Sequence, residues 1–272
     1  MDEGRSHEMM VPLGETALRS GLVTSRIGHS LYLFHEVDST NEEAANLAAR
    51  GAPEGTVVIA EAQRRGRGRM GRRWASPKGL GIYLSVILRP PISPNRTPVL
   101  SLLGALGVAE AIERTAGLEA ALKWPNDLIV GGRKVGGLLG ELCAEASRLQ
   151  HVILGIGINV NQDEADFEAE LRQTATSLKI ESGRLVDRAA VIRSVCESLD
   201  HWYDRFLSSG VAAILDGVRR RCLTLGREVV ARSGDQELRG LAVDLDDEGA
   251  LMIRDGRGSL HRLYAGDVTL TG

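Results

Sequence analysis

The sequence predicts an α+β fold, with a large domain followed by a small C-terminal β-barrel of SH3-like size. Up to about residue 224, strand-like and helix-like segments occur in separate runs, without the βαβ alternation of a parallel sheet. From Arg227 onward the pattern changes to short strands separated by turn residues. The chain has 272 residues, of which 43% are hydrophobic and 25% charged, as expected for a soluble globular protein.

Charge and cysteine usage exclude several classes of protein. A net charge of −3 gives the chain no general attraction to nucleic acid. The three cysteines lie far apart and form no CxxC pair, so we expect a reduced, cytoplasmic protein. The six histidines lack metal-site spacing, and the N-terminus lacks the apolar segment of a signal peptide. No apolar stretch is long enough to span a bilayer, so we expect no membrane association and no metal held by protein ligands.

The first ninety residues predict an arm, a helix and three strands. Residues 1–30 have weak periodicity and are expected to form an arm or a short helix. Residues 38–50 predict a helix in which Ser39 is the N-cap, Glu42 completes a capping box and Gly51 follows the end. Strands are predicted at residues 31–35, 56–60 and 81–88.

The middle of the chain predicts helices around a hairpin. Gly131 and Gly132 suit a tight turn, and a nearly continuous apolar run after the hairpin indicates a buried strand. The hairpin is predicted at residues 121–142, the buried strand at 152–160, and helices at 99–114, 188–207 and 211–223.

The C-terminal segment predicts five short strands. They fall at residues 228–231, 237–243, 251–254, 261–264 and 268–270. We therefore expect an arm at residues 1–30, the large domain at 31–224 and the SH3-like domain at 225–272.

Residues 63–74 (QRRGRGRMGRRW) have almost no apolar side chain and predict a loop rich in glycine and arginine. Its glycines match the GxGxxG pattern of dinucleotide-binding folds, but Pro77 blocks the helix that such a fold needs. Guanidinium groups and turned-in N–H groups suit phosphate oxygens, so the loop is expected to bind an anion and to be mobile without one. A solvated basic loop and a nucleic-acid contact remain alternatives. Trp74 is expected either to stack on a base or to anchor the loop.

A second polar cluster surrounds the predicted hairpin. Residues 123–127 (KWPND) precede it, and Lys134 returns on its second strand toward the Asp127 end. Because the chain has only four lysines beside 29 arginines, two of them here suggest a site that wants an ammonium group. A plain turn at Asn126 and Asp127 is the alternative.

Smaller signals lie elsewhere. Residues 39–41 (STN) are explained by helix capping, or by a helix N-terminus that grips a polar ligand. Gly136 and Gly137 suggest close approach to a strand backbone. Asn159 ends an apolar strand, where a ligand or a turn would use its amide.

Taken together, these segments resemble a biotin protein ligase, also called biotin holocarboxylase synthetase. The resemblance covers residues 31–272 and rests mainly on 66–74 (GRGRMGRRW) and 123–127 (KWPND), with weaker matches at 38–41, 133–137, 155–159 and 175–178. It implies a class II synthetase-like catalytic domain, with a mixed β-sheet flanked by helices, before the SH3-like domain. Only about thirty residues precede the first predicted strand, so the expected type lacks an N-terminal DNA-binding domain.

The resemblance also implies the biotin-binding residues. The ureido ring of biotin would be bound by Ser39, Thr40 and Gln63, with Asn41 close by. Gly66, Arg67, Gly68 and Arg69 would form a loop that becomes ordered over biotin and the adenylate. Lys134 would contact the biotin carboxylate and the α-phosphate, and Gly137 and Gly157 would form the pocket wall.

The implied nucleotide side uses other residues. Trp74 would cover the adenine, while Arg69 and Lys134 would bind phosphate. The remaining residues on this side would be Lys123, Asn126, Asp127 and Asn159.

The implied reaction activates biotin with ATP to biotinyl-5′-AMP and transfers biotin to a lysine of a biotin carboxyl carrier protein. Mg²⁺ would arrive on ATP, and the catalytic residues would be Arg67, Arg69, Lys134 and Asp127, the last as a candidate base. A homodimer is left open, and no DNA partner is expected. A lipoate or octanoyl ligase or transferase of related fold is one alternative, although it would lack the two main motifs. A nucleic-acid-binding protein without enzymatic activity is the other.

Overall fold

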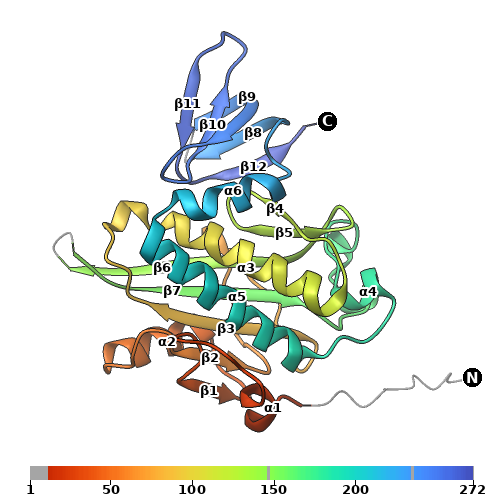
Figure 1. The fold of residues 1–272 in the computed structure, drawn as a ribbon. Coiled ribbons are helices and arrows are strands. Elements are labelled where there is room, and N and C mark those ends of the chain that lie inside the picture. The colour runs from red at the N-terminus through yellow and green to blue at the C-terminus, as the bar shows by residue number, and fades with distance from the viewer. Residues whose placement is uncertain (1–11, 146–147, 234–235, 272) are drawn as a thin grey trace, which may run out of the picture.

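A seven-stranded mixed sheet forms the large domain in the computed structural model, which describes residues 12–145, 148–233 and 236–271 (Figure 1). Its order is β1-β2-β3-β7-β6-β5-β4, with β1 and β2 parallel and the other pairs antiparallel. The strands are β1 (Leu31–Phe34), β2 (Val57–Ala60), β3 (Gly81–Leu88), β4 (Ala121–Lys123), β5 (Asp127–Val130), β6 (Arg133–Glu145) and β7 (Arg148–Asn159).

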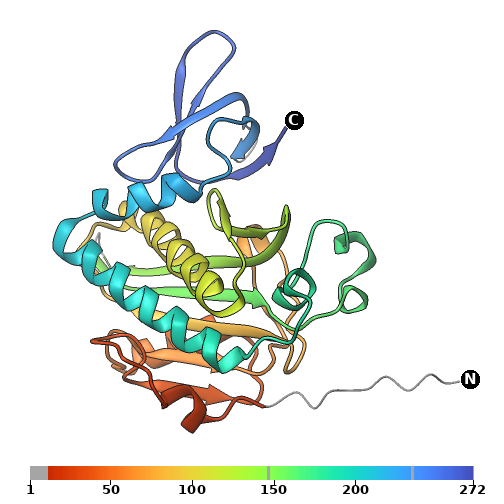
Figure 2. The same ribbon diagram turned by 45° about the vertical axis from the view of Figure 1, so that its right-hand side comes forward.

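Helices cover both faces of this sheet. The long helices α3 (Pro98–Ala116) and α5 (Arg188–Ser209) lie side by side on one face, as Figures 1 and 2 show, and α6 (Ala212–Arg221) packs against both. On the other face, α2 (Thr40–Ala49) buries Ala44 and Ala48 against β2, β3 and β7. The short helices are α1 (Glu15–Arg19) and α4 (Leu178–Ser182). Since β3 is covered on both sides, all eight of its residues are buried.

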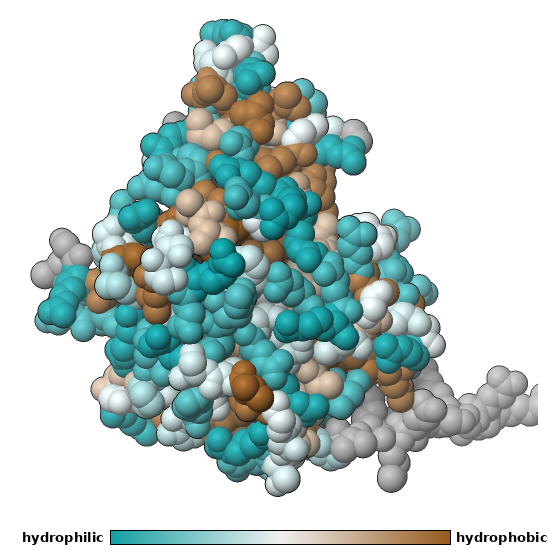
Figure 3. Space-filling model, in the orientation of Figure 1, coloured by the Kyte–Doolittle hydropathy of each residue, from teal (hydrophilic) through white to brown (hydrophobic). Residues whose placement is uncertain are grey.

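The C-terminal domain is a second sheet of five antiparallel strands, of the SH3-like type, with order β11-β10-β9-β8-β12. Its strands are β8 (Glu228–Ser233), β9 (Gln236–Leu245), β10 (Leu251–Arg254), β11 (Leu260–Leu263) and β12 (Asp267–Leu270). The buried Trp124 of the large domain donates its indole N–H to Gly249 O (3.1 Å), which joins the two sheets. Figure 3 shows apolar residues gathered over this small domain.

Most of the predicted elements are confirmed, including the five C-terminal strands and the turn at Gly131 and Gly132. The buried strand is longer than predicted, because the end of β6 (143–145) and the start of β7 (148–151) pair with each other beyond the rest of the sheet. The residues of these two segments are mostly exposed and show no periodicity that would predict a strand. The helix α4 was not predicted. The expected domain boundaries remain a proposal; within the expected arm, Leu18 and Ile27 are buried in the main core.

The predicted capping box of α2 is wrong. Ser39 is the N-cap residue, yet its side chain makes no capping hydrogen bond, and Glu42 is exposed. The side chain of Gln63 takes this place, because Gln63 Oε1 accepts a hydrogen bond from Thr40 N (2.8 Å). A residue of the glycine–arginine loop therefore satisfies one of the free N–H groups at the start of the helix.

Candidate functional site

A buried polar network lies where α2 begins. Thr40 and Asn41 are 4% exposed, and Ser39 is 2% exposed. The hydroxyl of Ser85, on β3, lies 2.6 Å from Asn41 Oδ1 and 2.8 Å from Thr40 Oγ1. Asn41 Nδ2 donates to Glu141 Oε2 (2.6 Å). The residues predicted to bind the ureido ring, Ser39, Thr40 and Gln63, thus lie together, and hydrogen bonds fix the side chains of Thr40 and Gln63.

The glycine–arginine loop has a defined hairpin-like backbone. Trp74 N donates to Gly66 O (2.9 Å) and Gly68 N donates to Arg72 O (2.7 Å), while the short 3-10 helix Arg69–Gly71 forms the tip. A Cβ atom on Gly66 would lie 2.4 Å from Trp74 O, so this close approach requires glycine. At the root, Gln63 Nε2 donates to Ser76 Oγ (2.9 Å).

Carboxylates from distant segments neutralise the loop. Asp38 accepts hydrogen bonds from Arg65 and Arg64, which hold the pKa of Asp38 below its ordinary value. Arg67 Nη2 lies 3.2 Å from Glu141 Oε2, and Arg72 pairs with Asp267. The expected repulsion between neighbouring arginines is therefore offset by acidic partners that the local sequence does not reveal.

Trp74 lies against two glycines of the sheet. A Cβ atom on Gly157, in β7, would lie 2.6 Å from Trp74 Cε2, and one on Gly137, in β6, would lie 3.6 Å from Trp74 Cζ3. The two glycines are register partners, so they form one flat platform without side chains. Lys134 Nζ lies 5.6 Å from the centre of an indole ring, at cation–π distance. The indole Nε1 is buried without a hydrogen-bond partner among the described residues.

Lys134 and Asp127 form the charged centre of the site. Lys134 Nζ lies 2.6 Å from Asp127 Oδ1, as expected from the hairpin that brings β6 back beside β5. The neighbouring Asn126 accepts a hydrogen bond from Arg69 Nη1 (3.0 Å) and donates to Leu138 O (2.8 Å). Burial lowers the pKa of the Arg69 guanidinium, and the charge of Asp127 opposes that shift. The loop, β5 and β6 thus bring two cations, Arg69 and Lys134, and one carboxylate, Asp127, close together.

Asn159 and Lys123 are the remaining residues predicted on the nucleotide side. Asn159 is buried, and its amide is engaged within the protein: Nδ2 donates to Thr176 O (3.0 Å) and Oδ1 accepts from Gln162 Nε2 (3.4 Å). Lys123 is half-buried on β4 and opposes Asp127 in the strand pairing. Their predicted contacts with nucleotide remain predictions.

The structure adds residues that the sequence analysis missed. Ser85 and Glu141 join the polar network, and Asp267 reaches the loop from the C-terminal domain. The sequence did hold a sign of Ser85. It is a small polar residue in the middle of the apolar run 81–88 (GIYLSVIL), where Tyr83 carries the other hydroxyl. Glu141 and Asp267 had none, since only the tertiary fold brings them near.

A groove of about 230 Å³ opens beside the charged centre. Its walls come from the β6–β7 hairpin, the start of α3 and the C-terminal domain, and include Arg69, Asn126, Leu142 and Tyr264. Leu142 and Tyr264 are 51% and 46% exposed, so the groove meets the surface at an apolar rim.

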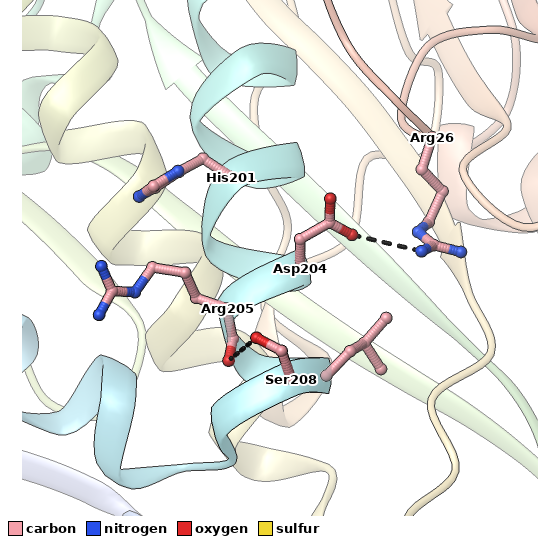
Figure 4. A pocket seen from close by; sticks show the side chains of 6 residues that line it. Arg26, His201, Asp204, Arg205 and Ser208 are labelled. Carbon is pink, nitrogen blue, oxygen red and sulfur yellow. Dashed lines mark hydrogen bonds and ion pairs between the residues drawn. The ribbon is translucent and has the colours of Figure 1, made fainter.

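A wider depression lies elsewhere, beside α5 (Figure 4). Arg26 and Asp204 form an ion pair there (3.3 Å), and Ser208 Oγ lies 3.3 Å from the carbonyl oxygen of Arg205. None of the residues predicted to act in the site lines this depression.

Both domains of this chain are similar to known proteins. Residues 33–159 match the biotin/lipoate A/B protein ligase family, and residues 224–270 match the biotin protein ligase C-terminal domain. The "Biotin--[acetyl-CoA-carboxylase] ligase" of Mycobacterium tuberculosis is 34% identical, over 94% of this chain and 95% of that protein. This chain belongs to the biotin protein ligase family.

Other members of the biotin protein ligase family are also similar to this chain in sequence and structure. The "Bifunctional ligase/repressor BirA" of Bacillus subtilis is 40% identical, over 95% of this chain and 79% of that protein. The solved biotin protein ligase of Aquifex aeolicus in complex with biotin and ATP has a TM-score of 0.76 and 31% identity, over 89% of this chain and 99% of that one. The predicted fold is thereby confirmed. Within the described part of the chain, no helix is long and apolar enough to cross a membrane.

Proposed function

We propose that this chain activates biotin with ATP to biotinyl-5′-AMP and then transfers biotin to a lysine of a carrier protein. The observation that carries the proposal is the meeting of Trp74, Lys134 and Asp127 on the glycine platform of β6 and β7. An apolar ligand fits against a flat glycine surface, and its charged end would reach Lys134. Relatives named as biotin ligases, and a relative solved with biotin and ATP, support this over a lipoate or octanoyl substrate.

The biotin head group would be bound at the start of α2. Ser39, Thr40 and Gln63 offer both donors and acceptors, which suits a ureido group that carries two N–H donors and one carbonyl acceptor. The hydroxyl of Ser85 lies within hydrogen-bond distance of both Thr40 Oγ1 and Asn41 Oδ1, and so helps to hold Thr40 in place. The Trp74 indole covers Gly157 and Gly137 in this structure, so the biotin tail would run along these glycines toward Lys134 after the indole has moved aside.

In the first step, a carboxylate oxygen of biotin attacks the α-phosphorus of ATP, and pyrophosphate leaves. No protein nucleophile is needed. The chain positions the two anions and offsets their charge with Lys134, Arg69 and Arg67. Arg67 would exchange its contact with Glu141, and Lys134 its contact with Asp127, for contacts with the bound anions. Mg²⁺ bound to the ATP phosphates would neutralise part of their charge. Among the described residues, no group of three or more His, Cys, Asp or Glu side chains is suited to holding this ion.

In the second step, the neutral amine of the acceptor lysine attacks the acyl carbon, an amide bond forms and AMP leaves. The groove beside Arg69 and Asn126 offers a path for this lysine side chain. Asp127 is our candidate to accept the proton, once Lys134 has moved its contact to the phosphate. The loop would keep water from the mixed anhydride.

The test of the proposed function is exchange of labelled pyrophosphate into ATP, with and without biotin. We expect exchange that depends on biotin and is not supported by lipoate or octanoate. Exchange with lipoate instead of biotin would reverse the assignment. Biotin attachment to a purified biotin carboxyl carrier domain, followed by mass spectrometry, tests the second step.

We also keep the predictions of a cytoplasmic location and of no binding to DNA. The net charge of −3 supports the latter, whereas the name of the Bacillus relative describes a repressor. A gel-shift titration with mixed-sequence and promoter DNA, with and without biotin, tests it. Sedimentation of the same samples tests whether the chain forms a homodimer.

A further inference from the structure

The tip of the glycine–arginine loop contacts the C-terminal domain. Arg69 Nη1 donates to Gly266 O (3.3 Å), and Arg72 forms an ion pair with Asp267. Asp267 is the first residue of β12 and Gly266 precedes it, so both contacts fall on one short segment of the small domain. The root of the loop is held differently, by Asp38 of the large domain.

The segment that receives the loop is itself fixed. A Cβ atom on Gly266 would lie 2.5 Å from Arg232 O, so Gly266 packs directly against the β8 backbone. Asp267 opposes Arg232 in the pairing of β12 with β8. The Gly266 carbonyl and the Asp267 side chain therefore face the loop from a rigid sheet edge.

The tip has a backbone conformation that needs support. Met70, between Arg69 and Arg72, has a φ of +57°, the one non-glycine residue with positive φ among the described residues. Its side chain is 64% exposed, so packing of Met70 does not stabilise this conformation. The contacts on both sides of Met70, from Arg69 to Gly266 and from Arg72 to Asp267, add to the backbone hydrogen bonds within the loop in holding the tip.

We propose that Asp267 is a positioning residue, which holds the loop tip closed across the two domains while biotinyl-5′-AMP is in the site. This rests on the proposed function, in which the loop covers the adenylate. Asp267 acts through Arg72 and touches no substrate. The pair is about one-third exposed on the Asp267 side, so it is weak enough to open for release of the product to the carrier.

The test uses the full chain with the variants Asp267→Asn, Asp267→Ala and Arg72→Glu, and the double variant Arg72→Glu/Asp267→Arg. Release of biotinyl-5′-AMP, followed by rapid filtration, should be about two- to fivefold faster in the single variants, as expected for loss of an exposed ion pair. The charge-swapped double variant should regain most of the wild-type rate. Glu248→Gln is the control, because it removes an ion pair with Arg262 within the same domain.

A purely structural role of Asp267 would lower the melting temperature without changing release. We therefore measure both, together with amide hydrogen exchange of residues 63–74 in the adenylate complex. Faster release, weaker loop protection and restoration by the charge swap would support the proposal. Wild-type release in every variant, or faster release that the swap does not restore, would overturn it. Failure of the wild type to exchange pyrophosphate in a biotin-dependent manner would instead contradict the proposed function.

Discussion

The backbone of Gly157 lies directly beneath the indole of Trp74, so close that a methyl group on Gly157 would come within 2.6 Å of the ring. The ring also borders Gly137 on the neighbouring strand. Strand and loop are thus fitted to each other through two residues that lie more than eighty positions apart in the chain.

This contact predicts the effect of Gly157→Ala. The new methyl group would push Trp74 away from the sheet and make the flat glycine surface smaller. We therefore expect the affinity for biotinyl-5′-AMP to fall at least about tenfold, or about 1.4 kcal/mol. Isothermal titration with a non-hydrolysable adenylate analogue measures this. Gly256→Ala is the control, since a Cβ atom there meets nothing within 4 Å. Unchanged affinity in Gly157→Ala would show that the platform is not the ligand surface.

Lys134→Arg is expected to impair adenylation although the positive charge is kept. The site holds a compact ammonium 2.6 Å from Asp127 and close to Trp74, and a planar guanidinium is longer and differently shaped. We expect biotin-dependent pyrophosphate exchange to fall about tenfold or more, or about 1.4 kcal/mol of barrier. Lys179→Arg, which alters an ion pair with Asp163 away from the site, serves as the control. Exchange near the wild-type rate would remove Lys134 from the reacting centre.

Arg69→Ala is expected to leave the fold intact and to release the adenylate faster. The side chain contacts Asn126 and Gly266 at the surface of the core and does not fill it. The intermediate should appear free in solution, where chromatography detects it, while the melting temperature changes little. Arg239→Ala, which removes an exposed contact with Glu237, is the matched control. If the melting temperature collapses and release stays slow, the role of Arg69 is structural.

The cysteines give a direct test of burial. Cys196 is fully buried, which raises the pKa of its thiol to about 12, and burial also raises the pKa of Cys222. A raised pKa keeps both thiols protonated, and therefore unreactive, well above neutral pH. Cys143 is exposed on the β6–β7 hairpin. Iodoacetamide at pH 8 should therefore label one cysteine per native chain, as mass spectrometry would show, and three after denaturation. Rapid labelling of Cys196 in the native chain would contradict the packing of α5.

The sequence predicted the segments of the site better than its connections. The hairpin around Gly131 and Gly132 brings Lys134 to Asp127, because turn chemistry and strand pairing are local properties. The capping of α2 was predicted wrongly for the opposite reason. A side chain from another segment, Gln63, competes with the local capping box, and only the tertiary fold decides between them.

The charge balance of the loop could not be predicted for the same reason. Six arginines in ten residues suggest repulsion when the segment is considered alone. Their partners are Asp38, just before α2, Glu141, in β6, and Asp267, in the C-terminal domain. Composition indicates that cations gather there, but it carries no information on which distant acid will meet each one.

The approach of Gly155 to Asn41 has a consequence for how this family changes over time. A Cβ atom at position 155 would lie 2.2 Å from Asn41 Oδ1, and that oxygen is held by Ser85. A larger residue at position 155 therefore requires a smaller residue at position 41, and the change at 41 leaves Ser85 with Thr40 as its remaining acceptor. We expect positions 155 and 41 to be inherited as one unit, so that family members with a larger residue at 155 have a smaller one at 41.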